Sequence, residues 1–157
     1  MTQYFFKLSL SLILLSSFTF AKSKLYVLPQ DAQQSEKKIL QLIKKSKKNI
    51  KIAMYNLKYK KFIKALKKVH KKGISIDLYL DKDKASKKRI NFIKYKTFNK
   101  KLHIKAVLFD DKTVVFGSAN WKKESFDTNM EIIYITDEVK IVKEFKAMFK
   151  QLSKQTN

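Results

Sequence analysis

Short runs with strand character alternate along this chain with longer runs of helical periodicity, and this alternation limits the possible fold more than any other feature. The strand-type runs are rich in β-branched and aromatic residues, and the helix-type runs repeat apolar residues three or four positions apart. Such alternation is typical of helices that pack on the faces of a sheet. The sequence therefore predicts an α/β fold, a layered mixed β-sheet flanked by helices.

The expected strands are short and mostly apolar. Pro29 ends the first of them, since proline cannot donate a hydrogen bond to a sheet ladder. The predicted ranges are Leu25–Leu28, Ile50–Tyr55, Ile74–Leu80, Leu102–Phe109, Thr113–Phe116 and Met130–Thr136.

Four helices are expected between and after these strands. Ser35 is a candidate N-cap for the first, and Gly73 stands where the second would end in a left-handed conformation. A weaker helix is predicted over Ala85–Lys94. The apolar faces of the other three would carry Ile39, Leu42 and Ile43, then Phe62, Ile63, Leu66 and Val69, and finally Val142, Phe145, Phe149 and Leu152.

The chain has 157 residues, the size of one domain, and a formal net charge of +23. All but one of its 36 basic residues are lysines, Arg89 being the exception. This excess favours a polyanionic partner, either nucleic acid or an anionic membrane surface, although an AT-rich coding sequence can explain part of it. Lysine is a point charge without a planar fork, so it suits sequence-independent phosphate contact.

The amino terminus has the pattern of an export signal. Lys7 precedes an apolar run over Leu8–Phe20, and small residues at Thr19 and Ala21 resemble a cleavage site. The run is short for a membrane span. We expect residues 1–21 to be a signal peptide, with an uncleaved anchor as the alternative, and residues 22–157 to form the domain. The expected location is the periplasm or the periplasmic side of the inner membrane.

Polar side chains interrupt the apolar run HIKAVLFDD that begins at His103. In a strand, residues two apart share a face, so His103 and Lys105 would point the same way. The turn Asp110–Lys112 would return the chain to a second strand, Thr113–Phe116, after which Gly117 opens GSAN and places Ser118 and Asn120 just beyond the strand. The glycine would let the backbone approach a ligand or a neighbouring strand closely.

Glu131 shares a strand face with Ile133 and Ile135, so its carboxylate would lie on an apolar surface and need a partner. His103 is the candidate. An imidazole bonded to a carboxylate can serve as nucleophile or base, while lysine, serine and asparagine can donate to phosphate oxygens. The set predicts phosphoryl-transfer chemistry.

The stretch HIKAVLFDDKTVVFGSAN has the HxK(x)4D(x)6GSxN pattern of the phospholipase D superfamily. The chain resembles most the small bacterial Nuc-type endonucleases of that superfamily, which carry one copy of the motif. The similarity runs from about Leu25 to Phe149 and includes IAMYNLKYKKFIKALKKVHKKGISIDLYLDK before the motif and NMEI after it.

The resemblance implies a role for each matching residue. His103 would be the nucleophile that forms a phosphohistidine, and Glu131 would orient it. Lys105, Ser118 and Asn120 would bind phosphate oxygens. Asp110 would join strand ends, with Gly117 in support, and Asp111 has no counterpart in the pattern. The resemblance also implies that the reaction needs neither a metal nor another cofactor.

One motif per chain implies a homodimer. The superfamily places two histidines across one phosphate, so a second copy would supply the other half of the site at a two-fold interface.

Three functions remain open from the sequence. The first is a non-specific endonuclease on single- or double-stranded DNA, with RNA as a further substrate, acting in uptake or degradation of external DNA. The second is a phospholipase D or phosphatidyl transferase on membrane phospholipids. The third, a DNA-binding module with a decayed site, is disfavoured because every motif residue is present.

A few other residues invite a functional interpretation. Asp81 and Asp83 follow a strand as metal ligands can, but a turn is the commoner use of such a pair. Trp121 could stack on a base or pack at the dimer interface, with packing favoured. Tyr55 is a candidate for the wall of the site, and His70 is expected on the surface.

Overall fold

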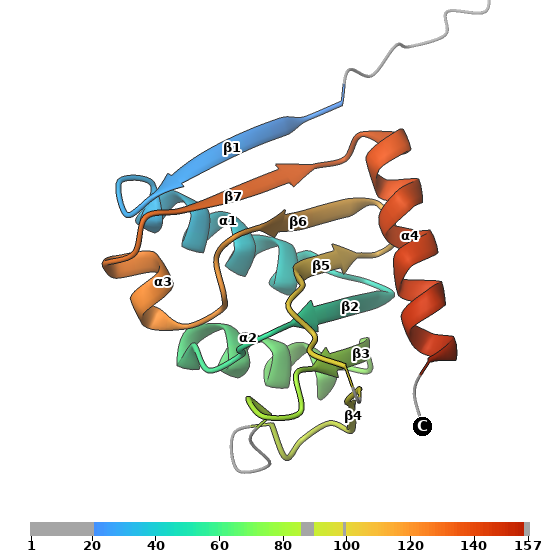
Figure 1. Ribbon diagram of the computed structural model, residues 1–157. Coiled ribbons are helices and arrows are strands. Elements are labelled where there is room, and N and C mark those ends of the chain that lie inside the picture. Colours follow the sequence, from blue (N-terminus) through green and yellow to red (C-terminus); the bar gives the residue numbers. More distant parts are fainter. Residues whose placement is uncertain (1–20, 86–89, 99, 156–157) are drawn as a thin grey trace, which may run out of the picture.

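The computed structural model describes residues 21–85, 90–98 and 100–155. Within this part of the chain, one mixed seven-stranded sheet runs through the molecule in the order β1-β7-β6-β5-β2-β3-β4 (Figure 1). The fold class predicted from the sequence is confirmed. The strands are β1 Ser23–Leu28, β2 Asn49–Met54, β3 Ser75–Leu80, β4 Tyr95–Lys96, β5 Lys105–Phe109, β6 Thr113–Gly117 and β7 Glu131–Thr136.

Helices cover both faces of this sheet. They are α1 Ala32–Lys45, α2 Lys60–His70, α3 Lys123–Asp127 and α4 Val139–Lys154.

The pairing of the strands decides which chain ends meet. Strands β2, β3 and β4 are parallel to one another, whereas β2–β5, β5–β6, β6–β7 and β7–β1 are antiparallel. Consequently the start of β5, the end of β6 and the start of β7 lie at the same end of the sheet, which is also where β2 ends (Figure 1). The predicted site residues are attached to these four strand ends.

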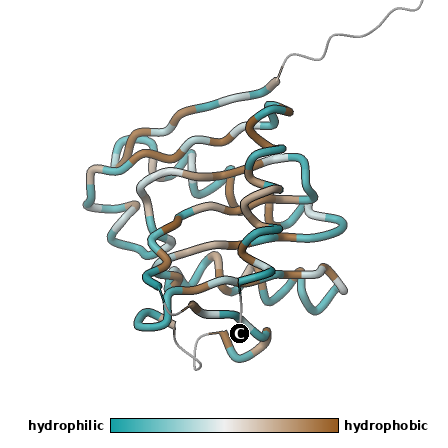
Figure 2. The backbone as a smooth tube through the Cα atoms, turned by 45° about the vertical axis from the view of Figure 1, so that its right-hand side comes forward, coloured by the Kyte–Doolittle hydropathy of each residue, from teal (hydrophilic) through white to brown (hydrophobic). Residues whose placement is uncertain are grey.

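The hydrophobic core has two layers, one on each side of the sheet. The larger layer packs α1, α2 and α3 against the sheet, with fully buried Ile39, Phe62 and Phe126 at its centre. The smaller layer lies under α4, where Val142, Phe149 and Leu152 contact residues of the central strands. Figure 2 shows hydrophobic residues gathered in the central strands and hydrophilic ones in the connecting loops.

Two of the predicted local features are wrong. Ser35 does not cap α1: the helix begins at Ala32, and the buried Ser35 hydroxyl donates to the Ala32 carbonyl at 2.9 Å. The predicted helix over 85–94 is not formed where that segment is described, because Ile90–Ile93 make turns and bends. Residues 86–89, with Arg89, lie outside the described residues.

Gly73 ends α2 as predicted, with a φ of +88° and a hydrogen bond from its N–H to the His70 carbonyl at 2.9 Å. The expected signal segment lies outside the described residues, except for Ala21. No described helix is both long and apolar enough for a membrane crossing.

Candidate active site

An open pocket of about 570 Å³ lies where β5 starts, β6 ends and β7 starts. Within the described part of the chain, all of the predicted phosphate-binding and catalytic residues reach it. Its lining consists of His103, Lys105, Gly117, Ser118, Asn120, Lys122, Asn129 and Glu131. Below, this space is called the catalytic pocket.

His103 and Lys105 lie on one side of the chain, although the strand is shorter than predicted. Strand β5 starts at Lys105, and the preceding residues continue beside β2 through a single bond from the Tyr55 N–H to the Ile104 carbonyl at 2.9 Å. The His103 ring meets the edge of the Tyr55 ring at 4.8 Å between centroids. Tyr55 therefore supports the imidazole from the side.

The Lys105 ammonium is held close to the histidine. Its Nζ donates to the His103 carbonyl oxygen at 2.8 Å and lies 5.4 Å from the Tyr55 ring. Partial burial lowers the pKa of Lys105, and the charge of Lys101 lowers it further, while the Glu131 carboxylate acts in the opposite direction. Glu131 and Lys105 thus interact electrostatically across the catalytic pocket.

Gly117 allows β6 and β7 to approach each other closely. A Cβ atom at this position would lie 2.1 Å from the Ile132 carbonyl oxygen. The close approach that the sequence predicted is therefore to a neighbouring strand. Ser118 continues the contact: its N–H donates to the Ile132 carbonyl at 3.1 Å, and its hydroxyl accepts from the Ile132 N–H at 3.0 Å.

The side-chain amide of Asn120 is held in place through its oxygen atom. Its Oδ1 accepts a hydrogen bond from the Asn56 N–H at 3.0 Å. This bond turns the amide so that Nδ2, which has no partner among the described residues, is available as a donor in the catalytic pocket. The geometry matches the needs of a phosphate oxygen.

Glu131 faces the catalytic pocket, but its contacts differ from the prediction. Within the described residues it has no hydrogen bond to His103. Instead, Oε1 accepts from the Ser125 hydroxyl at 3.4 Å and from the Asn129 amide at 3.3 Å. Because both bonds reach the same oxygen, Oε2 remains without a hydrogen-bond partner in the described part of the chain.

The two aspartates of the turn serve the scaffold. The Asp110 carboxylate accepts from the backbone N–H groups of Lys47, Lys48 and Asn49 at 2.8–3.1 Å, which ties the β5–β6 turn to the start of β2. Burial raises the pKa of this carboxyl, but the three N–H groups and Lys112 outweigh burial and hold it below its usual value. Asp111 forms an ion pair with Lys51 at 2.6 Å.

The other singled-out carboxylates and aromatic residues lie away from the catalytic pocket. Asp81 is buried and accepts from the N–H groups of Asp83 and Leu102, both at 3.1 Å, so the pair forms a turn. Trp121 is 2% exposed and packs on Phe62 at 4.7 Å, so it belongs to the core of its own chain and not to a dimer interface or a base-stacking surface.

His70 is half-buried, and its Nδ1 lies 3.3 Å from the Ile74 carbonyl oxygen. Among the described residues, no group of three or more histidines and carboxylates is arranged to hold a metal ion.

Sequence reasoning missed the residues that hold the motif in place. Asn56, Ser125 and Asn129 each bond a motif or strand residue of the catalytic pocket. Asn129 stands two positions before Glu131, a spacing that could have indicated a contact, whereas Asn56 and Ser125 give no signal in the sequence.

Comparison with known proteins gives the family. The model of the cardiolipin synthase, PLD-like domain family matches residues 39–153. The chain belongs to the phospholipase D superfamily. This assignment confirms the resemblance found in the sequence motif.

Solved structures of the superfamily share the fold. NucT from Helicobacter pylori superposes with a TM-score of 0.80 at 24% identity, covering 87% of this chain and 98% of that one. The phospholipase D family member Nuc from Salmonella typhimurium gives a TM-score of 0.75 at 20% identity, covering 88% and 97%.

A curated relative, the mitochondrial cardiolipin hydrolase of Xenopus tropicalis, is 24% identical over an alignment of 124 residues that covers 73% of this chain. The match spans only 59% of that relative's length. The superfamily assignment and the Nuc-like fold support a phosphodiesterase of the hydrolase class, whose substrate is a separate question.

Proposed function

We propose that the protein is a metal-independent endonuclease that cuts DNA, and RNA as a second substrate, with little regard for sequence. The observation that carries the proposal is the meeting of His103, Lys105, Asn120 and Glu131 in one open pocket of a chain with a net charge of +23. A superfamily phosphodiesterase with this charge is suited to a polyanionic phosphodiester.

The proposed reaction has two balanced steps. In the first, a ring nitrogen of His103 attacks the phosphorus atom, the N–P bond forms, and the bond to the leaving oxygen breaks as that oxygen takes a proton from the partner's His103. In the second, the partner's His103 takes a proton from water, the water oxygen bonds to phosphorus, and the N–P bond breaks. The product is a hydrolysed phosphodiester and a free histidine.

Lys105, Ser118 and Asn120 would stabilise the charge on the non-bridging oxygens. Lys105 supplies a full positive charge, and the free Nδ2 of Asn120 supplies a neutral donor. These groups would do the work that a metal cation does in other nucleases. Glu131 is a positioning residue: its Oε2 is available to accept the N–H of the imidazole and hold the required tautomer.

We propose that the active form is a homodimer, because one chain supplies one catalytic histidine. A strip of apolar side chains favours this assembly. It lies on the α4 side of the sheet, where register places Val27 opposite Ile132, Leu25 opposite Tyr134, and Tyr134 opposite Phe116. Leu25, Val27 and Ile132 are 41–50% exposed. We call these five residues the apolar strip.

The apolar strip reaches the same end of the sheet as the catalytic pocket, where the Ile132 backbone bonds Ser118, but the side chains of Ile132 and Glu131 point to opposite faces. A second copy seated on the strip would cover the α4 face at this end of the sheet, so the shared site would have to form across the strand ends. We also propose that residues 1–21 direct export to the periplasm, either by cleavage or as an anchor. Mass spectrometry of the amino terminus of the native protein tests this, and a mature chain that begins at Met1 would contradict cleavage.

Phospholipid is the second candidate substrate. The relative named as a mitochondrial cardiolipin hydrolase and the family description favour it, and Met130, which is 90% exposed beside Glu131, could enter a membrane surface.

A cleavage assay in excess EDTA separates the two substrates. We expect wild-type protein to degrade plasmid and single-stranded DNA under these conditions and His103→Asn to bind DNA without cutting it. Intact nucleic acid, together with hydrolysis or headgroup exchange of phospholipid in vesicles, would establish the lipid activity instead. Retardation of DNA on a gel without any cleavage by wild type would indicate a binding module.

A further inference from the structure

A second hollow of about 730 Å³ lies beside the catalytic pocket, along α2 and α3. We call it the α2 groove. Its cationic lining consists of Lys58, Lys60, Lys64, Lys67 and Lys123.

The α2 groove and the catalytic pocket share the same two backbone segments. Lys122 lines the catalytic pocket, and the next residue, Lys123, lines the groove. On the facing segment, the Asn56 N–H holds Asn120, while the N–H groups of Lys58 and Tyr59 donate to the Trp121 carbonyl at 2.9 and 2.7 Å. A chain that leaves the catalytic pocket past Asn120 would therefore enter the groove.

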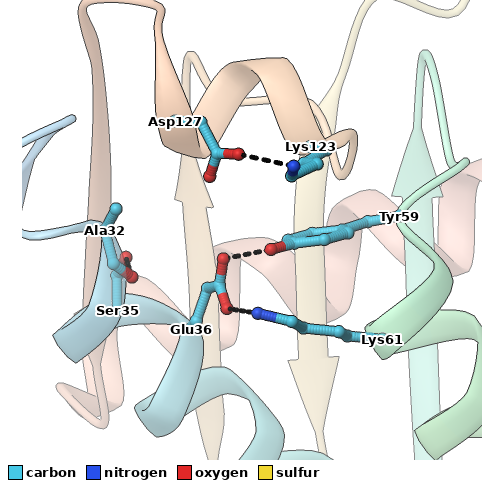
Figure 3. A network of polar contacts seen from close by, with 7 residues as sticks. All are labelled: Ala32, Ser35, Glu36, Tyr59, Lys61, Lys123 and Asp127. Carbon is cyan, nitrogen blue, oxygen red and sulfur yellow. Dashed lines mark hydrogen bonds and ion pairs between the residues drawn. The ribbon is translucent and has the colours of Figure 1, made fainter.

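The positive charge of the groove is largely uncompensated. Lys60, Lys64 and Lys67 are exposed on one face of α2 and, in the part of the chain that the structure describes, form no ion pair. Lys61 differs, because it points toward α1 and pairs with Glu36 at 2.8 Å (Figure 3). On the α1 side, by contrast, Glu36 compensates the charge of Lys61.

The other ionisable groups of the α2 groove change its net positive charge little. Lys58 lies 3.6 Å from Glu124, and Lys123 lies 3.4 Å from Asp127, as partly exposed pairs that solvent screens. Tyr59 turns its hydroxyl to Glu36 (Figure 3), and burial, together with that hydrogen bond, raises the pKa of Tyr59 to about 12. Tyr59 therefore stays neutral and adds no negative charge to the groove.

Like charges one and two turns apart weaken a helix, so an anion that lies along α2 would relieve their repulsion. Lys60 and Lys67 are separated by about 10 Å along the helix axis, a length that covers roughly two or three successive phosphates of one nucleic-acid strand. The ring of Tyr59 is almost fully buried, which leaves this part of the groove without an exposed aromatic surface for base stacking. Contact along it would be electrostatic and independent of base sequence.

We propose that the α2 groove holds the phosphates of the nucleic-acid strand on one side of the scissile bond. The proposal rests on the proposed function, and it names the path by which the substrate reaches beyond the catalytic pocket. A hollow suits a strand better than a membrane, since a bilayer presents a broad surface that cannot enter it.

Binding by the His103→Asn protein, measured through the anisotropy of a labelled single strand, tests the path without cleavage. We expect Lys60→Glu with Lys67→Glu to weaken binding of a long strand about tenfold, and the slope of log K against log salt to become shallower by about 1.4. A dinucleotide, which ends within the catalytic pocket, should show a much smaller change. The milder pair Lys60→Gln with Lys67→Gln should act in the same direction.

The matched control is Lys37→Glu with Lys44→Glu on α1. It has the same seven-residue spacing, the same change of charge and similarly exposed side chains. Equal losses in both double variants would overturn the proposal, because the effect would then come from net charge alone. Unchanged strand binding with lost binding to phosphatidylglycerol vesicles would overturn it in favour of a membrane surface.

Failure of the proposed function is a different result. In that case wild-type protein would leave DNA and RNA intact, whereas the anisotropy comparison uses the inactive form and reports on the groove alone.

Discussion

Gly117 is the residue whose replacement should damage the fold most directly at the site. A methyl group there would meet the Ile132 carbonyl oxygen at 2.1 Å, and backbone must move to admit it. We expect Gly117→Ala to lower the free energy of unfolding by about 3 kcal/mol, the upper end of the usual cost of overpacking. Urea unfolding followed by circular dichroism gives the value.

Gly73 supplies the matched control, since a Cβ there would have nothing within 4 Å. Because Gly73 has a positive φ, we expect Gly73→Ala to lower the free energy of unfolding by about 1–2 kcal/mol. A larger loss at Gly73 than at Gly117 would contradict the account of the β6–β7 approach.

Asp110 should make stability depend on pH in acid. Its pKa is lowered in the folded state, so its contribution is complete above the unfolded value, about 3.9, and is lost as pH falls through the folded value. We expect Asp110→Asn to be less stable than wild type at pH 7 and the difference to shrink below about pH 4. Urea unfolding at both pH values measures this. A difference that is constant with pH would show that the carboxylate charge is not what joins β2 to the turn.

The sequence predicted single residues better where the motif fixes them. His103, Lys105, Ser118, Asn120 and Glu131 reach one pocket, as their spacing indicated. The sequence did not predict the hydrogen bonds that Glu131 accepts from Ser125 and Asn129. The bond to Ser125 depends on the packing of α3 and leaves no periodic signal, whereas Asn129 is a near neighbour of Glu131 in the sequence.

The apolar strip along β1, β7 and β6 should be the surface through which two chains associate. Ile132 is 47% exposed and lies opposite Val27, so a charge on either would be buried unpaired in a dimer. We expect Ile132→Lys and Val27→Lys to be monomeric in light scattering and to lose nuclease activity. Val139→Lys is the control, because Val139 is 81% exposed and lies outside the strip.

Two outcomes would contradict this surface. One is a monomeric Ile132→Lys protein that keeps full activity, and the other is a Val139→Lys protein that loses the dimer as readily.

The helices and strands were predicted correctly where apolar residues recur at a regular spacing. The prediction failed where tertiary contacts determine the local structure. Helix α1 starts early because the Asp31 carboxylate accepts from the Val27 N–H at 2.9 Å and organises the turn after Pro29. The apolar residues of segment 85–94 predicted a helix that is not formed in its described part. Ile90 and Phe92 do pack on the core, but they do so from turns and bends. Strand β5 starts late, at Lys105, and the Leu102 N–H at the start of the predicted strand donates to the Asp81 carboxylate instead.

For the whole molecule, composition predicted a polyanionic partner but could not locate the surface that we propose for it. The α2 groove gathers lysines from α2, the loop before it and α3, and only the fold brings these segments together. The layered sheet was predictable, because the alternation of helix and strand patterns is a property of the whole chain. The homodimer was inferred from the presence of one motif per chain. That number indicates a second copy but does not identify the residues through which the two copies associate.

The central claim is that each chain supplies half of a phosphodiesterase site, with both histidines acting on one bond. Wild-type and His103→Asn chains, refolded together in equal amounts so that subunits mix at random, test it through nuclease activity in EDTA. Only dimers with two histidines should cut, so the account predicts about a quarter of the activity of the same amount of wild-type dimer. Activity of about half, as expected when each chain works alone, would contradict it.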